Sequence, residues 1–293
     1  MNTNINWYPG HMAKTKREIK ELISIIDIVY ELVDARIPFS SKINDLNNLT
    51  KNKEKILIMT KKDLCDLNIT NKWIKYYEEN GYNVILANLT NNEDYKKIIN
   101  LTNKLSKRIN DKRKLKGLKE KELKALVLGV PNTGKSTLIN VLAGKKVASV
   151  ANKPGVTKNL SWLKTKHNIL ILDTPGVLWP KFTTSEGFAL AATSAIKTEV
   201  LPINEVAVYI LTKLNIYYPE KLKERYGIPY FDEENIEDAY KNISKHLNIA
   251  LKKEEIDYEK VSHYIINDIK NGNIKEITFV RGIEIEQIWK RIK

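Results

Sequence analysis

An eight-residue stretch with the pattern G-x-x-x-x-G-K-S restricts the fold more than any other part of this chain. It runs from Gly129 to Ser136 and reads GVPNTGKS. Such a loop needs glycines for a tight bend and a helix N-terminus behind it, because several backbone N–H groups must point at one anion. The apolar run from Ala125 to Leu128 fits a buried strand before the loop, and the residues up to Gly144 fit a helix after it. The pattern therefore predicts a strand-loop-helix unit of a parallel α/β sheet.

The same loop predicts a phosphate site. Lys135 would reach the β- and γ-phosphates of a nucleotide, and the Ser136 hydroxyl would take one position on Mg²⁺. We expect nucleotide contacts along the turn, from Asn132, Thr133, Gly134, Lys135, Ser136 and Thr137. The alternative is a glycine turn without a ligand, which the flanking strand and helix patterns disfavour.

A second apolar run, from Ile169 to Leu172, ends in the tetrad Asp173-Thr174-Pro175-Gly176. A carboxylate at the end of a strand can hold the Mg²⁺ shell, so we expect Asp173 to contact the ion directly or through water. Gly176 can offer its N–H to the γ-phosphate because it has no Cβ in the way. An ordinary turn after a strand is the alternative, and the preceding phosphate loop favours the metal site.

The polar stretch between these two motifs contains Lys153-Pro154-Gly155-Val156-Thr157. Thr157 is a candidate switch residue, whose hydroxyl and carbonyl would close on Mg²⁺ and the γ-phosphate only in the triphosphate state. A simple proline-glycine turn remains the alternative.

The tetrad Thr60-Lys61-Lys62-Asp63 follows a buried-strand pattern, from Ile56 to Met59, and predicts a base site. Guanine presents two neighbouring donors that the Asp63 carboxylate can accept together, whereas adenine offers no such pair. Lys61 would lay its aliphatic stem along the base. Thr60 stands where the commonest guanine motif has Asn. A second base-contact loop usually carries a Ser-Ala pair; here Ala87-Asn88 stands at that place, and Asn88 is a further candidate contact. A lysine-rich surface turn is the alternative.

The order of these motifs is unusual, because the base tetrad precedes the phosphate loop, and it predicts a circularly permuted GTPase. With the segments Trp7 to Lys14, Asp34 to Pro38 and Tyr218 to Tyr226, the chain resembles the bacterial ribosome biogenesis GTPase A group, also called YlqF. The resemblance implies a GTPase that acts in late assembly of the large ribosomal subunit and is stimulated by the ribosomal particle. Its partners would be GTP, GDP and the large-subunit precursor, with its rRNA and ribosomal proteins.

Val177 occupies the position where many GTPases carry a water-orienting Gln, so we expect slow hydrolysis by the isolated protein. The resemblance implies that His11 positions the attacking water. The candidate catalytic residues are therefore His11, Lys135 and Thr157. A place in the turn and cap before a helix is the alternative role for His11. Related GTPases also use an Asn at the position of Asn132 to bind K⁺. The alternative is that Asn132 is simply an Asn that a turn tolerates.

Charge is distributed unevenly along the chain. The whole chain has a net charge of +14. Residues 1–200 carry 34 Lys and Arg against 19 Asp and Glu, a net charge of +15, whereas residues 201–293 carry 15 against 16, a net charge of −1. The densest basic segment predicts rRNA phosphate contacts, for which the candidates are Lys107, Arg108, Lys112, Arg113 and Lys114. A solvated helix face is the alternative reading.

Alternating strand and helix patterns up to about Leu178 predict a doubly wound, mostly parallel α/β sheet, which we assign to a GTPase domain over residues 1–182. Helical patterns then predict a small all-helical C-terminal domain over residues 183–293, packed on its own core. The chain lacks an apolar run long enough to span a membrane, and we expect a cytoplasmic monomer off the ribosome. A P-loop ATPase or kinase and a non-catalytic rRNA-binding scaffold are the rival functions.

Overall fold

The computed structural model describes residues 10–43, 49–145, 161–176, 182–196, 201–232, 235–249 and 255–281, with side chains from residue 14 on. The described strands are β1 (Ile28–Asp34), β2 (Glu54–Thr60), β3 (Asn83–Leu86), β4 (Leu123–Gly129), β5 (Ser161–Lys164) and β6 (Ile169–Asp173). The described helices are α1 (Gly10–Leu22), α2 (Leu67–Glu79), α3 (Asn92–Lys114), α4 (Lys135–Ala143), α5 (Thr184–Ala192), α6 (Ile203–Tyr217), α7 (Pro219–Tyr226), α8 (Ile236–His246) and α9 (Tyr258–Asn271).

The strands form one six-stranded sheet in the order β3-β2-β1-β4-β6-β5. Every neighbouring pair is parallel except β5 with β6. The chain moves outward from β1 to β3 and then returns to β4, so the strand order reverses between β1 and β4. Ligands of such sheets bind at this switch point, outside the carboxyl ends of the strands. The predicted doubly wound, mostly parallel sheet is confirmed, and so is the permuted order of its loops.

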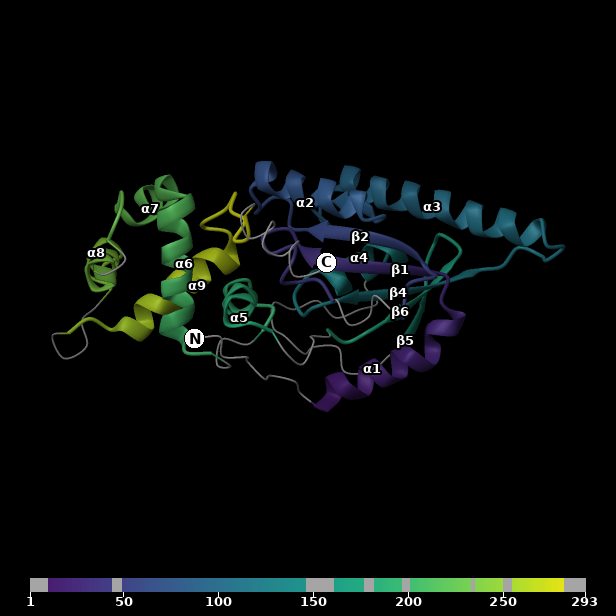
Figure 1. Ribbon diagram of the computed structural model, residues 1–293, viewed down its shortest axis with the longest axis horizontal. Coiled ribbons are helices and arrows are strands. Elements are labelled where there is room, and N and C mark those ends of the chain that lie inside the picture. The colour runs from purple at the N-terminus through teal and green to yellow at the C-terminus, as the bar shows by residue number, and fades with distance from the viewer. Residues whose placement is uncertain are drawn as a thin grey trace.

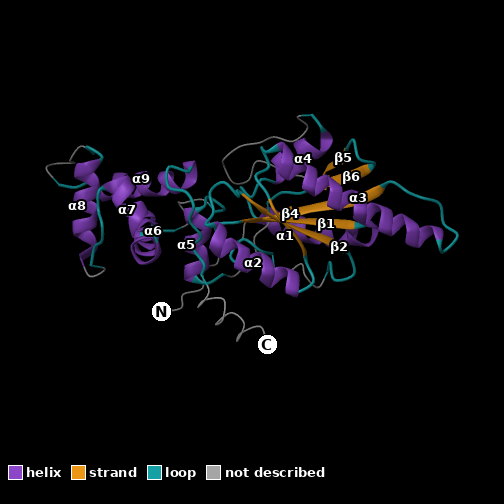
Figure 2. Cartoon of the chain, turned by 90° about the horizontal axis from the view of Figure 1, so that it is seen from above, coloured by secondary structure: helices purple, strands orange, loops and turns teal. Residues whose placement is uncertain are grey.

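Both faces of the sheet are covered because β1 is apolar on both sides. Ile28, Tyr30 and Leu32 share a core with the buried residues of α3 and α4. Val29 and Val33 face the opposite side, where α1 and α2 pack. Buried parallel strands read as continuous apolar runs for this reason. Figure 2 shows the strands fanned out with helices to either side.

The helical part lies beyond the carboxyl ends of β1 and β2, with α5 between it and the sheet (Figure 1). A capping box of Thr183 and Glu186 begins α5. The small residues from Ala189 to Ala192 are buried and belong to one cluster with Val29 of the sheet and Val206 of α6. The expectation of a separate helical core is wrong in this respect, because small alanine side chains let α5 join the two parts into one continuous core.

The spacing of apolar residues predicts C-terminal helices over residues 204–214, 219–225, 235–247 and 258–270, and α6 to α9 agree with these ranges to within three residues. The same spacing predicts an N-terminal helix over residues 14–26; the observed helix begins earlier, at Gly10, and ends in a 3₁₀ turn over Ile23–Ile25. None of the helices in the described ranges is both long and apolar enough to cross a membrane.

Candidate nucleotide-binding site

The base tetrad and the phosphate loop meet at the carboxyl edge of the sheet. Register places Thr60 beside Asp34, and Leu32 beside Gly129, so β1 separates the two loops by one strand. The buried Thr60 hydroxyl bonds to the Thr133 carbonyl oxygen at 2.9 Å, across 73 residues of sequence. It also lies 3.1 Å from the carbonyl oxygen of Val33. Thr60 therefore ties the two loops together, although it lacks the amide of the commoner Asn.

The phosphate loop bends through left-handed backbone. Gly134 has a φ of 91°, and a Cβ there would lie 2.9 Å from Leu89 Cδ1, so a side chain is excluded by conformation and by space. The Thr133 hydroxyl donates to the Val130 carbonyl at 2.8 Å, and Lys135 Nζ donates to the same oxygen at 2.9 Å. These two bonds close the loop on the Val130 carbonyl oxygen. Ser136 and Thr137 begin α4 and are half-buried.

Lys135 and Asp173 form the charged centre of this edge. Burial lowers the pKa of Lys135 to about 8, although the charge of Asp173 acts to raise it. Burial also raises the pKa of Asp173, against the opposing effect of Lys135. Asp173 Oδ1 is buried and has no hydrogen-bond partner among the described residues. An acceptor left unpaired in this way suits a cation, so Asp173 and the Ser136 hydroxyl fit the donor set of a nucleotide-bound Mg²⁺.

Gly176 approaches the phosphate loop closely. A Cβ on it would lie 2.8 to 2.9 Å from three atoms of Pro131, two of them backbone, so only glycine fits. The Thr174 hydroxyl donates to the Val127 carbonyl of β4 at 2.6 Å. The tetrad after β6 therefore lies against the loop that would hold the phosphates.

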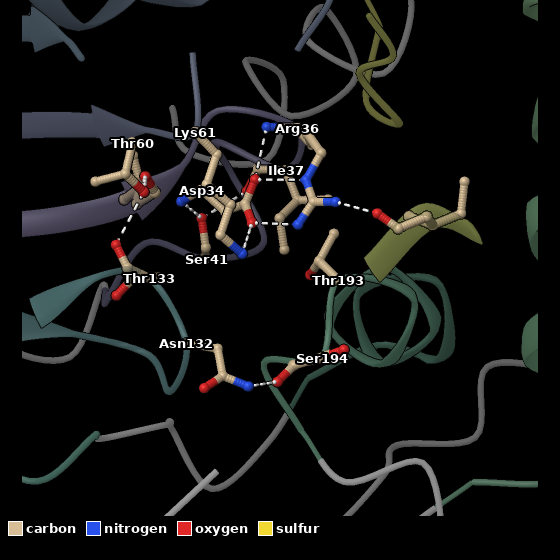
Figure 3. A network of polar contacts seen from close by, with 12 residues as sticks. Asp34, Arg36, Ile37, Ser41, Thr60, Lys61, Asn132, Thr133, Thr193 and Ser194 are labelled. Carbon is tan, nitrogen blue, oxygen red and sulfur yellow. Dashed lines mark hydrogen bonds and ion pairs between the residues drawn. The ribbon is translucent and has the colours of Figure 1, made fainter. Parts of the chain in front are cut away.

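Lys61 lies in a buried ionic network (Figure 3). Its Nζ is 2.9 Å from Asp34 Oδ2, and its backbone has a φ of 59°, which is rare for a side-chain-bearing residue. The fully buried Arg36 makes a bidentate pair with the same carboxylate, at 3.0 Å from Nε and 2.8 Å from Nη2. Burial acts to raise the pKa of Asp34, but the charges of Arg36 and Lys61 outweigh it and the pKa is lowered.

The remaining base candidates lie on the same rim. Asp63 is exposed on the loop after Lys61, and Lys62 pairs with Asp94 at 3.4 Å. Asn88 follows β3, and its side-chain oxygen accepts from the Thr90 hydroxyl at 2.7 Å. The side-chain oxygen of Asn88 therefore shapes the turn that follows β3.

Asn132 has a φ of 61° and donates from Nδ2 to the Ser194 carbonyl oxygen at 2.6 Å. Ser194 follows α5, so this bond links the phosphate loop to the helical part (Figure 3). Three other candidates lie outside the described residues: Thr157, Val177 and the side chain of His11, whose backbone is in the first turn of α1.

The RNA-contact candidates lie on α3, which extends past the sheet (Figure 1). Arg108 pairs with Glu54, Lys114 pairs with Glu120 at 2.6 Å, and Arg113 donates to the Lys119 carbonyl oxygen at 3.0 Å. Lys107 and Lys112 are exposed on the same helix, and no ion pair to them is found within the described residues. These two lysines are therefore better placed than the other three to meet a polyanion.

Sequence reasoning gave no structural role to Asp34 and Arg36, although the network at Lys61 depends on them. Their segment was noted only for its family resemblance. The available signal was a carboxylate at the end of a mostly apolar strand with a guanidinium two residues later, because such charges must pair when buried.

Comparison with known proteins gives concordant results. A family model described as a 50S ribosome-binding GTPase matches residues 124–267. A Bacillus licheniformis protein named Ribosome biogenesis GTPase A is 42% identical over 276 residues, covering 94% of this chain and 97% of the relative. A Thermotoga maritima protein of the same name is 28% identical and covers 97% of each chain.

Solved structures resemble the chain over most of its length. GNP-bound YlqF from T. maritima matches with a TM-score of 0.63 at 24% identity, covering 92% of this chain and 98% of that one. A GDP-bound YlqF structure matches with a TM-score of 0.61 at 25% identity, covering 91% and 100%. The two structures share the fold described above.

Proposed function

The chain belongs to the ribosome biogenesis GTPase A family, and from this premise we propose how its residues carry out the function. The protein is a GTPase of ribosome biogenesis, specifically of the large subunit. Its GTP and GDP would lie across the switch point, with the base against Lys61 and Asp63 and the phosphates in the loop around Lys135. Asp63 would accept from both donors of the guanine edge, which sets the preference over adenine.

One observation supports this arrangement above the others. The Thr60 hydroxyl lies 2.9 Å from the Thr133 carbonyl oxygen, so the end of the base strand touches the phosphate loop. The two halves of a nucleotide site need to be held at a fixed separation, because catalysis depends on reacting groups that are held in the correct geometry. A rival ATPase would have no use for the Asp63 carboxylate at this position.

The phosphate end of the pocket fits a magnesium ion carried by the nucleotide. Asp173 and Ser136 would hold it, and the ion would neutralise charge that develops between the β- and γ-phosphates. Burial lowers the pKa of Lys135 despite the charge of Asp173, so phosphate oxygens would add negative charge that favours its protonated form. Thr157 would complete the closed state by approaching the γ-phosphate.

Hydrolysis would depend on a group brought in by the ribosomal particle. We assign to His11 the orientation of the attacking water, since a neutral imidazole can accept a proton from water near pH 7. Asn132 would add a potassium ion beside the phosphates. Its side-chain oxygen remains available for that purpose, because the bond to Ser194 uses the amide nitrogen.

The particle would be a late precursor of the large subunit, met as a monomer in the cytoplasm where subunits assemble. Lys107 and Lys112 on α3 would contact rRNA phosphates, positioning the GTPase without reading sequence. Residues 1–182 would then contain the nucleotide site, and residues 183–293 would contribute the second, helical unit.

The decisive experiment has two parts. Equilibrium binding of GDP and ADP tests the base site, and we expect a strong preference for GDP. GTP turnover is then measured with and without purified large-subunit particles. Slow turnover that rises on adding particles supports the proposal, whereas equal affinity for ADP or turnover indifferent to particles contradicts it.

A further inference from the structure

The loop that reads the base is held in place by the C-terminal end of the described chain. We call residues 272–281 the C-terminal clamp; they follow α9 and lie beside the start of α2 (Figure 1). The Ile277 N–H donates to the Leu64 carbonyl oxygen at 3.1 Å, one residue after Asp63. The Thr278 hydroxyl accepts from the Asp66 N–H at 3.2 Å. The clamp therefore bonds to the backbone immediately after the base-reading carboxylate.

Asp66 is the point where these contacts converge. Its Oδ1 accepts from the Asn68 and Ile69 N–H groups and so caps α2. Its Oδ2 accepts from the Tyr218 hydroxyl and from Arg281 Nη2, both at 3.1 Å. The Arg281 guanidinium lies 4.4 Å from the centre of the Tyr218 ring, which is a cation–π contact. Tyr218 and Arg281 therefore contact each other, and both bind Asp66.

A second chain of contacts reaches the other side of Asp63. Lys61 pairs with Asp34, Asp34 pairs with Arg36, and Arg36 Nη1 donates to the Ile269 carbonyl of α9 at 2.8 Å. The clamp also contacts this arginine, because the Phe279 N–H donates to the Arg36 carbonyl oxygen at 2.8 Å. The helical part thus contacts the backbone directly after Asp63, and it is linked to Lys61, before Asp63, through Arg36 and Asp34.

The loop and the clamp pack closely, and polar side chains between them are buried. Gly272 begins the clamp with a φ of 75°, and a Cβ there would lie 2.8 Å from Leu64 Cδ2. Arg36 is 1% exposed, and the Thr278 side chain is fully buried. A shift of α9 would therefore break charge-assisted bonds in a water-excluded site, where leaving one partner unpaired is costly.

We propose that Tyr218, Arg281 and the C-terminal clamp are positioning elements for the base-reading loop, so that docking of the helical part and retention of guanine nucleotide are coupled. This inference rests on the proposed function, since it needs the base at Lys61 and Asp63. Coupling between two sites is reciprocal. Bound nucleotide stabilises the docked clamp, and a partner that pulls the helical part away speeds nucleotide release. GDP and GTP carry the same base, so the dissociation rates of both nucleotides change by the same factor.

The test is the dissociation rate of mant-GDP from the full-length protein. Tyr218→Phe removes the hydroxyl that reaches Asp66, and Tyr218→Phe with Arg281→Ala removes both side-chain contacts. We expect the double variant to release mant-GDP about five- to tenfold faster than wild type, with the same factor for a mant-labelled GTP analogue. Tyr240→Phe is the matched control, because its buried hydroxyl bonds to Ser262 inside the helical part. We expect its release rate to equal that of wild type.

Hydrogen exchange gives the reciprocal measurement on the wild type. The amides of Ile277 and Phe279 donate to Leu64 and Arg36 across this contact, and the Thr278 amide donates to the Tyr218 hydroxyl beside it, so GDP should slow the exchange of all three. The inference is overturned if the folded double variant releases mant-GDP at the wild-type rate, or if GDP leaves the exchange rates of these amides unchanged. Wild type that fails to prefer GDP over ADP would instead overturn the proposed function.

Discussion

Replacing Lys135 by Met should make the nucleotide-free protein more stable while removing its ability to bind nucleotide. Lys135 is only 7% exposed, and burial lowers its pKa from 10.5 to about 8. This lowering corresponds to about 3 kcal/mol of unfavourable free energy for the charged form at neutral pH. Met has a similar length and no charge, so the variant escapes this cost.

Part of the gain is offset at Asp173, which loses its counter-charge in the variant. Its pKa is already raised by burial, and Lys135 acts to lower it. We therefore expect a net gain of about 1–2 kcal/mol in the free energy of unfolding at pH 7. The charged Lys135 destabilises the folded state fully below pH 8, and this cost disappears as the pH rises from about 8 toward 10.5. The advantage of the variant should shrink over the same range.

Urea unfolding at pH 7 and pH 9.5, without nucleotide or Mg²⁺, measures both effects. Lys72→Met, at an exposed position of α2, is the control and should change stability by less than about 0.5 kcal/mol. GDP with Mg²⁺ should raise the melting temperature of wild type and of the control, and leave that of Lys135→Met unchanged. A Met variant that is less stable than wild type at pH 7, or whose difference from it does not depend on pH, would refute the reasoning.

Three further predictions concern catalysis and the particle. His11→Ala should keep wild-type GDP affinity and lose roughly 100-fold or more of the particle-stimulated turnover; stimulated turnover at the wild-type rate would remove His11 from the mechanism. GTP turnover should be faster in potassium than in sodium buffer, and equal rates would leave Asn132 as a turn residue only. Lys107→Gln with Lys112→Gln should weaken rRNA binding and reduce the slope of log affinity against log salt by about 2, while Lys241→Gln on α8 keeps the wild-type slope.

Much of the fold could be predicted because the relevant signals are local. Ala125 to Leu128 and Ile56 to Met59 are apolar runs beside loop-forming residues, and each is part of a buried strand. Gly144 closes α4 with a φ of 67°, as a C-cap glycine should. Strand β5 carried no such signal, because Ser161–Lys164 is an exposed edge strand with mixed polarity.

The site could be predicted less completely because several of its contacts join distant segments. Nothing near Asn132 in the sequence indicates that its amide meets the Ser194 carbonyl oxygen, 62 residues away. Arg36 reaches Ile269 across 233 residues, and the pairing depends on how α9 docks. The three- and four-residue spacing of Val206, Ile210 and Leu214 predicts the buried stripe that α6 has, but it cannot show that α5 connects this stripe to the sheet.

The central claim is that the base tetrad and the phosphate loop form one guanine-nucleotide pocket, and the nucleotide preference of Asp63→Asn tests it most directly. Asp63 is exposed on its loop, so the substitution should leave the fold intact. An amide can donate to the xanthine edge but cannot accept both guanine donors. We predict that the variant loses roughly 10- to 100-fold in GDP affinity and gains preference for xanthosine diphosphate. A folded variant that still prefers GDP would contradict the account.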